Sequence, residues 1–255
     1  MNNIIKSVLI SFVVLISSCS GSDNEAQQPP LENNVEIQTP VSLDFDTYTY
    51  IAKIISEPTT IKVYEEPSES SKVINELEHP KEIPGVSEPI DLYFTFVENS
   101  EMPSGWINVN LPVRPNGSTG WIRSDKVKRQ RTLYSIQIDR QNFELKVLYD
   151  SQPILTTPVA IGNGDTPTPA GKFFITELLD SSELNPAYGP YAYGLSGYSE
   201  TLKEFKGVDA IIGIHGTDDP SSIGKNVSHG CIRVDNNIIS EMTEYLPFGT
   251  PVEII

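Results

Sequence analysis

Short runs of apolar and other strand-forming residues recur along the chain between turn-forming polar residues, and they predict β-strands. In the first half such runs lie at residues 48–55, 60–64, 90–97, 105–111 and 120–122. In the second half they lie at residues 133–138, 143–149, 154–161, 172–176, 210–214 and 252–255. Only the stretch from about residue 236 to 245 has a helical period, with Ile238, Ile239, Met242 and Tyr245 on one face. The expected fold class is therefore mainly β.

Turn-forming residues between these runs suggest how the strands are connected. The sequence Asp-Arg-Gln-Asn at residues 139–142 separates two predicted strands and favours a hairpin. Residues 181–199 are rich in Gly, Tyr, Pro and Ser, which predicts a long loop of the kind that often shapes a binding site. The tyrosines between residues 188 and 198 either line a substrate channel there or pack the loop. Tyr193 is our candidate for substrate binding among them.

The first 19 residues have the pattern of a targeting segment. Lys6 precedes an apolar run at residues 7–16 that is shorter than the roughly 20 residues needed to span a bilayer. The string Ile16-Ser17-Ser18-Cys19 resembles a bacterial lipobox, in which the cysteine is lipidated. We therefore expect a lipoprotein signal peptide at 1–19, lipidation of Cys19, and an exported protein held at a membrane of the cell envelope. The alternative is an ordinary cleavable signal that contains a cysteine.

Charge changes this picture in two ways. The chain carries 34 acidic residues against 18 Lys and Arg, which argues against a nucleic-acid partner. The excess is concentrated in residues 20–103, which hold 17 acidic and 4 basic residues. We expect a flexible linker at 20–47 and a largely solvated surface beyond it, with His79 exposed. The basic run at 126–131 is expected to be a solvated linker between two domains.

Cys231 is the only cysteine besides Cys19, so lipidation of Cys19 would leave its thiol without a partner in the chain. Such a thiol is a buried apolar residue, half of an intermolecular disulfide, a metal ligand or a nucleophile. The surrounding residues favour the nucleophile. His215-Gly216 precedes the string Ser228-His229-Gly230-Cys231-Ile232-Arg233, which brings two of the three histidines near the thiol in sequence.

These residue types fit thiol chemistry. An adjacent imidazole lowers the pKa of a cysteine because thiolate and imidazolium stabilise each other. His215 ends an apolar strand, where Gly216 permits a close turn and its carbonyl can orient the imidazole. Gly230 allows backbone N–H groups to face one point, as an oxyanion hole requires. Arg233 shares a face with Cys231 if the segment is extended, so it can pair with a substrate carboxylate.

A zinc site built from His215, His229 and Cys231 is the alternative. It lacks a second cysteine, and the His-Gly-Cys spacing is tight for two ligands of one metal. We therefore expect no metal and no cofactor.

His215-Gly216 together with the string from Ser228 to Arg233 resembles the signature of the L,D-transpeptidase (YkuD-type) catalytic family. The string Thr-Pro-Thr-Pro-Ala-Gly-Lys-Phe at 166–173 resembles the turn that leads into a core strand of that family. The resemblance implies a β-rich catalytic domain at 133–255, with Cys231 as nucleophile and His215 as general base. It also implies that Ser228 and His229 shape the site, Ser228 contacting substrate, and that the N–H groups of Gly230 and Cys231 hold the oxyanion. Many members have Asn where Arg233 stands, which leaves the role of Arg233 the least secure.

A second resemblance concerns the front of the chain. Residues 63–67 and the repeated Gly-Trp-Ile at 105–107 and 120–122 are similar to small bacterial barrels related to Src-homology domains. This implies a small β-barrel domain at 48–130. Trp106 and Trp121 are expected to pack in its core or between its strands.

The catalytic resemblance implies transfer of peptidyl groups between peptidoglycan stem peptides through a thioester on Cys231. Three alternatives remain open at this point. Water as acceptor would give an L,D-carboxypeptidase, and a protein amine as acceptor would attach envelope proteins to the cell wall. A lipid-anchored wall-binding protein with an inactive site is the third.

Overall fold

The computed structural model describes residues 43–55, 59–82, 88–180 and 185–255. The predicted signal peptide, Cys19 and most of the predicted linker lie outside these residues. No helix within the described ranges is long and apolar enough to cross a membrane.

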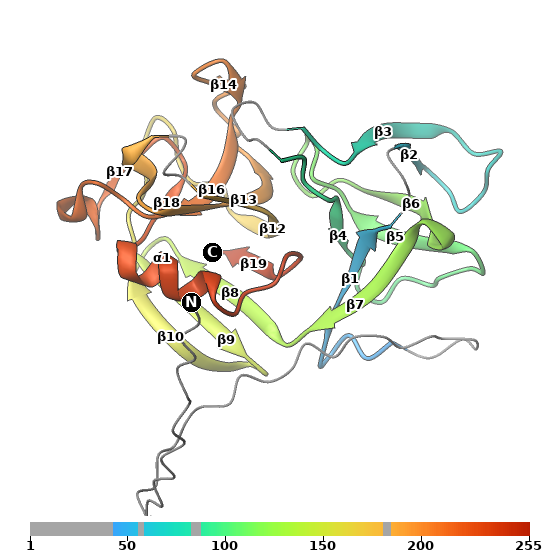
Figure 1. Ribbon diagram of the computed structural model, residues 1–255, viewed down its shortest axis with the longest axis horizontal. Coiled ribbons are helices and arrows are strands. Elements are labelled where there is room, and N and C mark those ends of the chain that lie inside the picture. The colour runs from blue at the N-terminus through green and yellow to red at the C-terminus, as the bar shows by residue number, and fades with distance from the viewer. Residues whose placement is uncertain (1–42, 56–58, 83–87, 181–184) are drawn as a thin grey trace, which may run out of the picture. The chain divides into compact units, whose positions relative to one another are not determined.

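Seven strands form what we call the N-terminal module, residues 49–132. They are β1 (Thr49–Ile54), β2 (Thr59–Tyr64), β3 (Val73–His79), β4 (Tyr93–Thr95), β5 (Trp106–Asn110), β6 (Thr119–Arg123) and β7 (Val127–Thr132). One sheet has the order β4-β1-β7 and the other β3-β2-β6-β5 (Figure 1). Both contribute to a single apolar core that includes Phe94 and Ile107. A closed barrel over residues 48–130 stays a prediction.

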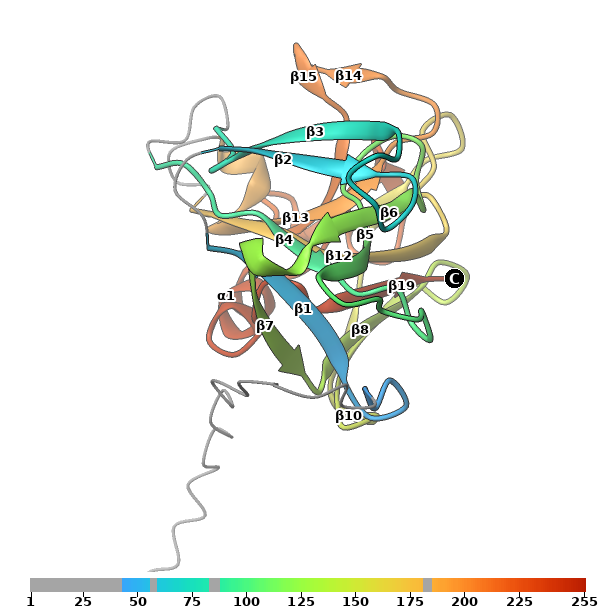
Figure 2. The same cartoon turned by 90° about the vertical axis from the view of Figure 1, so that its right-hand side faces the viewer.

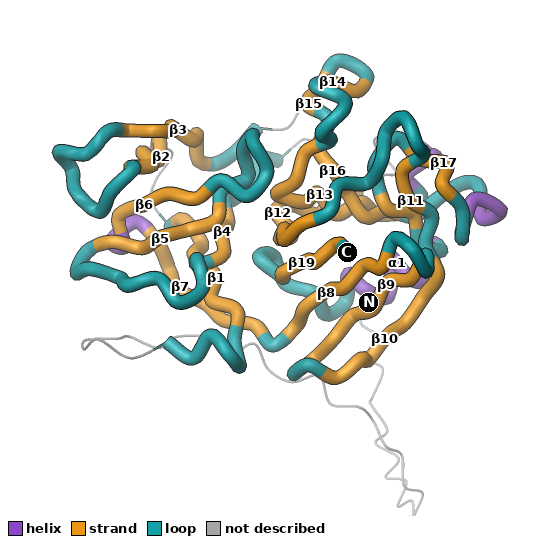
Figure 3. Tube along the Cα trace, turned by 180° about the vertical axis from the view of Figure 1, so that it is seen from behind, coloured by secondary structure: helices purple, strands orange, loops and turns teal. Residues whose placement is uncertain are grey.

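The remaining strands form the C-terminal module, residues 134–254. They are β8 (Tyr134–Asp139), β9 (Glu144–Tyr149), β10 (Gln152–Pro158), β11 (Ile161–Gly162), β12 (Gly171–Asp180), β13 (Tyr191–Tyr198), β14 (Glu204–Phe205), β15 (Val208–Asp209), β16 (Ile211–His215), β17 (Asn226–Ser228), β18 (Ile232–Arg233) and β19 (Pro251–Ile254). Eight of them form one mixed sheet in the order β10-β9-β8-β19-β12-β13-β16-β18. β11 and β17 pair separately, and Figure 3 shows them side by side.

The helix and the hairpin predicted for the second half are confirmed. Helix α1 (Asn236–Thr243) begins at Asp235, whose carboxylate accepts a hydrogen bond from the Asn237 N–H. It packs on β13 and β16, and its buried residues Ile239 and Met242 enter the core of the large sheet. β8 and β9 pair antiparallel in continuous register across the predicted turn. The mainly β fold class is therefore confirmed.

Three expectations from the sequence are wrong. Within the predicted loop at 181–199, residues 191–198 instead form β13, which lies between β12 and β16 in the middle of the sheet. The basic run at 126–131 is largely strand β7, because its backbone pairs with the whole of β1. His79 is buried, and its Nδ1 accepts a hydrogen bond from the Leu92 N–H. Its place at the end of β3 puts it under residue 92 rather than in solvent.

The two tryptophans lie on the neighbouring strands β5 and β6. Trp106 is buried and meets the ring of Tyr64 edge to face, with 5.2 Å between centroids. Trp121 is half-buried and pairs in register with Asn108 and Tyr64. Trp106 agrees with the expectation that it packs in the core or between strands, and the packing of the Trp121 side chain stays a prediction.

Candidate active site

The predicted nucleophile and base come from two neighbouring parallel strands. β16 and β18 pair so that Ile214 lies opposite Ile232 and His215 lies opposite Arg233. Side chains alternate between the faces of a strand, so His215 and Arg233 project from the same face of the sheet. Cys231 immediately precedes β18, and its thiol receives a hydrogen bond from the Gly213 backbone. The register therefore places the imidazole beside the guanidinium, and the thiol belongs to the residue just before β18.

His215 is held in one orientation by the backbone. The side chain is buried, and its Nδ1 lies 2.5 Å from the carbonyl oxygen of Gly216. A carbonyl only accepts, so Nδ1 carries the proton and Nε2 is left as the basic nitrogen. Gly216 cannot be replaced easily, because a Cβ there would collide with the side-chain oxygen of Asn236. The ring of Tyr188 covers the imidazole edge to face at 4.8 Å.

Burial opposes charge on both partners of the predicted pair. It lowers the pKa of His215 to about 4 and raises the pKa of the Cys231 thiol above its usual range. A hydrogen bond from the Gly213 backbone partly counteracts the effect on the pKa of the thiol. Burial therefore favours a neutral thiol and a neutral imidazole over the thiolate–imidazolium pair that the sequence suggested.

The thiol itself is lightly held. Cys231 is half-buried, and its Sγ lies 3.9 Å from the carbonyl oxygen of Ile211, the first residue of β16. A contact of that length is a weak hydrogen bond at most. The sulfur is thus available for reaction without breaking a strong interaction.

Ser228 shapes the loop around Cys231. Its hydroxyl is buried, donates to the Cys231 carbonyl at 2.6 Å and accepts from the Gly230 N–H at 3.1 Å. Both bonds stay within the loop, and a substrate contact for Ser228 stays a prediction. Because the Gly230 N–H already donates to the Ser228 hydroxyl, it is not free to bind an oxyanion. The Cys231 N–H remains as the candidate oxyanion donor. Gly230 has φ of +121°, a conformation that glycine adopts without strain.

Two threonines that the sequence analysis did not single out bind the backbone of the loop at residues 228–230. Thr168 is fully buried, donates from Oγ1 to the Gly230 carbonyl at 2.8 Å and accepts from the Gly162 N–H at 2.9 Å. Thr166 makes a similar bond to the Ser228 carbonyl at 3.3 Å. The Thr-Pro-Thr-Pro string was assigned only to a turn, yet its two hydroxyls support the backbone on either side of His229.

Arg233 and His229 face different surroundings. The Nε of Arg233 is buried and has no hydrogen-bond partner within the described part of the chain. A buried donor without a partner costs free energy, so the guanidinium is suited to receive an anion. His229 is exposed, and its ring lies 5.2 Å from that of Phe205, on the β14–β15 hairpin.

Tyr193 does not line the site. It is 1% exposed, belongs to the core of the large sheet, and its hydroxyl donates to the Met242 carbonyl at 3.1 Å. The substrate-binding role predicted for Tyr193 is wrong, because this residue lies on a central strand rather than in a loop. Tyr188, beside His215, is the tyrosine that reaches the site.

The described residues contain no group of three or more His, Cys, Asp or Glu side chains that could hold a metal ion.

Comparison with known proteins places this site in a family. Residues 133–254 match the family of L,D-transpeptidase catalytic domains named YkuD. The chain is 37% identical over 122 residues to the L,D-transpeptidase YkuD of Bacillus licheniformis, a match that covers 48% of this chain and 65% of that protein. It is 33% identical over 129 residues to the L,D-transpeptidase YqjB of Bacillus subtilis, covering 46% of this chain and 68% of that protein. The first of these relatives is thus matched over somewhat less than two thirds of its length.

Among solved structures, the catalytic domain of the Enterococcus faecium L,D-transpeptidase is 26% identical. That match covers 48% of this chain and 96% of the enterococcal domain, with a TM-score of 0.36.

Proposed function

The chain belongs to the YkuD family of L,D-transpeptidase catalytic domains, and on this premise we propose that it is a cysteine enzyme that transfers peptidyl groups between peptidoglycan stem peptides. In this proposal Cys231 is the nucleophile and His215 is the general base. Arg233 binds a carboxylate of the stem, and the substrate is a tetrapeptide stem whose third residue is a diamino acid.

One observation carries the proposal. The register of β16 and β18 places His215 opposite Arg233, two residues after Cys231, and the His215 Nδ1 is bonded to the backbone so that Nε2 is the basic atom. Cys231 and Arg233 both affect the pKa of Tyr188, whose ring contacts that of His215. A nucleophile, an oriented base and a guanidinium with one unpartnered nitrogen together form the set that acyl transfer from a charged peptide requires. The unpartnered Nε of Arg233 supports its part in this set.

The first half of the reaction forms a thioester. The Cys231 thiol gives its proton to Nε2 of His215 as the sulfur attacks the carbonyl carbon of the third stem residue. The tetrahedral oxyanion is held by the Cys231 N–H. The C–N bond to the terminal D-Ala then breaks, and the imidazolium returns the proton to the leaving amine.

The second half regenerates the thiol. The side-chain amine of another stem attacks the thioester carbonyl, the C–S bond breaks, and the proton lost by the amine reaches the sulfur through His215. The product is a cross-link between two third residues. Water or a protein amine in place of the second stem would give the carboxypeptidase or the protein-attaching transferase.

The test is the product formed from a defined substrate. We expect purified protein incubated with disaccharide-tetrapeptide to yield a dimer that has lost one D-Ala, observed by mass spectrometry. A tripeptide would instead identify the carboxypeptidase, because water would then be the acceptor. Intact tetrapeptide across several stem chemistries and pH values would contradict the proposed activity and favour a wall-binding protein.

We also propose that Cys19 is lipidated and that the protein acts at a membrane of the cell envelope. Support comes from the lipobox-like string before Cys19 and the apolar run at residues 7–16. Cys19→Ala is expected to move the protein from the membrane pellet to the soluble fraction, because a lipid chain is a large part of the affinity of such a protein for a membrane. Unchanged sedimentation of the variant would contradict lipidation.

A further inference from the structure

A short hairpin lies beside the proposed site. β14 and β15 are joined by Lys206 and Gly207, which have φ of +53° and +85°, as a tight two-residue turn requires. We call residues 204–209 the hairpin flap. In Figures 1 and 2 it projects away from the strands β13 and β16 that it connects. Two strands of two residues each are too short to be rigid without support.

The base of the flap is held by backbone bonds between residues 199, 203 and 210, and also by one turn of the N-terminal module. Arg114, between β5 and β6, donates hydrogen bonds to the carbonyls of three residues at the base of the flap: Ser199 at 2.7 Å, Leu202 at 3.0 Å and Lys203 at 3.2 Å. Its guanidinium also lies 4.7 Å from the ring centre of Tyr198. A planar guanidinium can make several such bonds at once because its donors are fixed in a fork.

Two further contacts hold the end of β13 against the same turn. Asn116 donates to the Tyr198 carbonyl and accepts from the Tyr198 N–H, both at 2.9 Å. The Tyr198 hydroxyl donates to the Pro112 carbonyl at 2.8 Å. The turn at 112–116 thus fixes the backbone of residues 198–203 through six hydrogen bonds.

We call the hydrogen bonds between the turn at 112–116 and residues 198–203 the clamp. The segment that the clamp holds leads directly to the proposed catalytic residues. On the flap, Phe205 packs on His229, two residues before Cys231. At its base, Tyr198 pairs with Ile211, whose carbonyl faces the Cys231 sulfur. A shift of residues 198–203 would therefore move both the ring that covers His229 and the backbone beside the thiol.

We propose that Arg114 is a positioning residue that holds the hairpin flap in place over the proposed active site, so that the N-terminal module sets the affinity for the stem peptide. Arg114 touches neither Cys231 nor His215 and acts through residues 198–203. This inference rests on the proposed function for its kinetic consequence, but the clamp itself can be measured without turnover.

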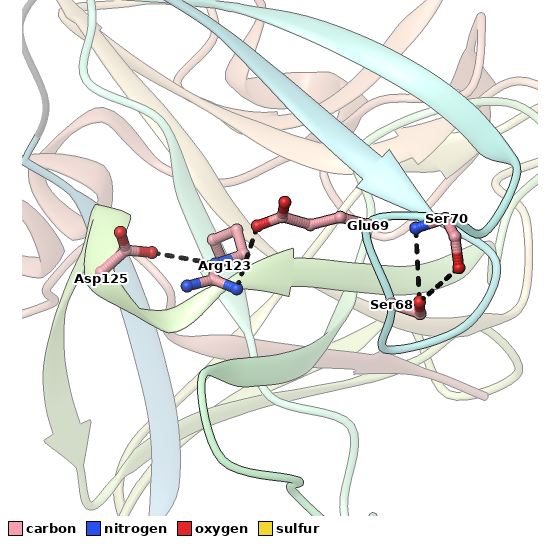
Figure 4. A network of polar contacts seen from close by, with 5 residues as sticks. All are labelled: Ser68, Glu69, Ser70, Arg123 and Asp125. Atoms are coloured by element: carbon pink, nitrogen blue, oxygen red, sulfur yellow. Dashed lines mark hydrogen bonds and ion pairs between the residues drawn. The ribbon is translucent and has the colours of Figure 1, made fainter.

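The chain offers a matched control in Arg123, which lies in the same module. Figure 4 shows its guanidinium paired with Glu69 and Asp125, both at 3.2 Å, beside the Ser68–Ser70 contact. All three side chains of this network are at least one third exposed, and it involves no residue of the flap. Arg123→Ala therefore removes the same side chain and charge without releasing the flap.

The first measurement is amide hydrogen exchange of the full chain. Arg114→Ala is expected to speed exchange across residues 204–209 by roughly tenfold, because the base of the flap loses three hydrogen bonds. Arg123→Ala is expected to leave that exchange unchanged, and Arg114→Lys to fall between the two, since a single ammonium cannot reproduce the fork. Equal exchange in Arg114→Ala and Arg123→Ala would overturn the clamp, whether or not the protein turns over stem peptides.

The second measurement is the split between KM and kcat with a tetrapeptide stem. Arg114→Ala is expected to raise KM roughly tenfold and to change kcat by less than about threefold, because the flap orders substrate but carries no reacting atom. The double variant Arg114→Ala/Phe205→Ala is expected to match Phe205→Ala alone, as coupled residues do. The positioning role would be overturned if Arg114→Ala sped hydrogen exchange of the flap but left KM unchanged. It would also be overturned if the effects of Arg114→Ala and Phe205→Ala on KM were additive in the double variant. Failure of the unaltered protein to use any stem would count against the proposed function, while the exchange result would still decide the clamp.

Discussion

Cys231→Ala is expected to lower kcat/KM for stem-peptide transfer by about 10³-fold or more, because no other group can form the thioester. The side chain is half-buried, lies 3.9 Å from the Ile211 carbonyl and receives a hydrogen bond from the Gly213 backbone. Removing its sulfur should therefore leave the fold intact. Initial rates with a tetrapeptide stem give the kinetic effect, and thermal unfolding of the same preparation confirms that the variant is folded.

Covalent capture separates a nucleophile from a residue that only supports binding. A carbapenem is expected to add its mass to the unaltered protein and not to Cys231→Ala. The matched control is Cys231→Ser, which keeps the size of the side chain but has a hydroxyl whose proton is much harder to remove. An adduct that persists in Cys231→Ala would rule out Cys231 as the acylated residue.

Thiol labelling tests the alternative of a metal site. In a Cys19→Ala chain Cys231 is the only thiol, so complete labelling by a thiol reagent would argue against a bound metal.

Local sequence patterns predicted the elements whose contacts are local. The β8–β9 hairpin follows from two alternating runs around a turn, and α1 follows from the spacing of Ile238, Ile239 and Met242. The strand that ends at His215 was visible for the same reason, since an apolar run ended at a polar residue and a glycine. His215 and Arg233 could be chosen as candidates from the sequence because each lies in a short motif, and the strands that hold them, β16 and β18, are neighbours in the sheet.

The elements that were missed depend on partners distant in sequence. β13 reads as a loop because it is rich in glycine and tyrosine, yet a Cβ at Gly197 would collide with the ring of Phe173 on β12, so the glycine permits close packing in the sheet. β7 lacks an apolar alternation and is ordered by pairing with β1. The burial of Tyr193 and the hydroxyls of Thr166 and Thr168 beneath the Cys231 loop follow from such long-range packing.

The charge state of the site was missed for a different reason. Proximity of a histidine and a cysteine in sequence favours an ion pair only if solvent or other charges offset the cost of burying two ions. Here His215 is 4% exposed, and burial has the larger effect on both pKa values. That balance is a property of the folded environment and cannot be obtained from the spacing of the residues.

The pKa of His215 leads to the second large effect. His215→Gln is expected to lower kcat/KM by about 10³-fold at neutral pH, since the amide cannot accept the thiol proton. Burial raises the pKa of the thiol, so almost no thiolate exists near pH 7 without a base. The residual rate of His215→Gln is then expected to rise about tenfold per pH unit toward alkaline pH, as the thiol ionises by itself. A residual rate that does not change with pH would show that His215 is not the base.

The unaltered protein is expected to lose activity only at acid pH and to need no alkaline pH for its full rate. A base works only when it is unprotonated, and burial lowers the pKa of His215 to about 4, so activity should be lost only as the pH falls through about 4. An exposed histidine would give the loss near pH 6.5. Rates of Cys231 alkylation by iodoacetamide between pH 3.5 and 8 would locate this limb without any stem substrate, and thermal unfolding at each pH would separate it from acid denaturation. An acid limb near pH 6.5 would mean that the imidazole is solvated when it reacts, and the neutral pair inferred from its burial would be wrong.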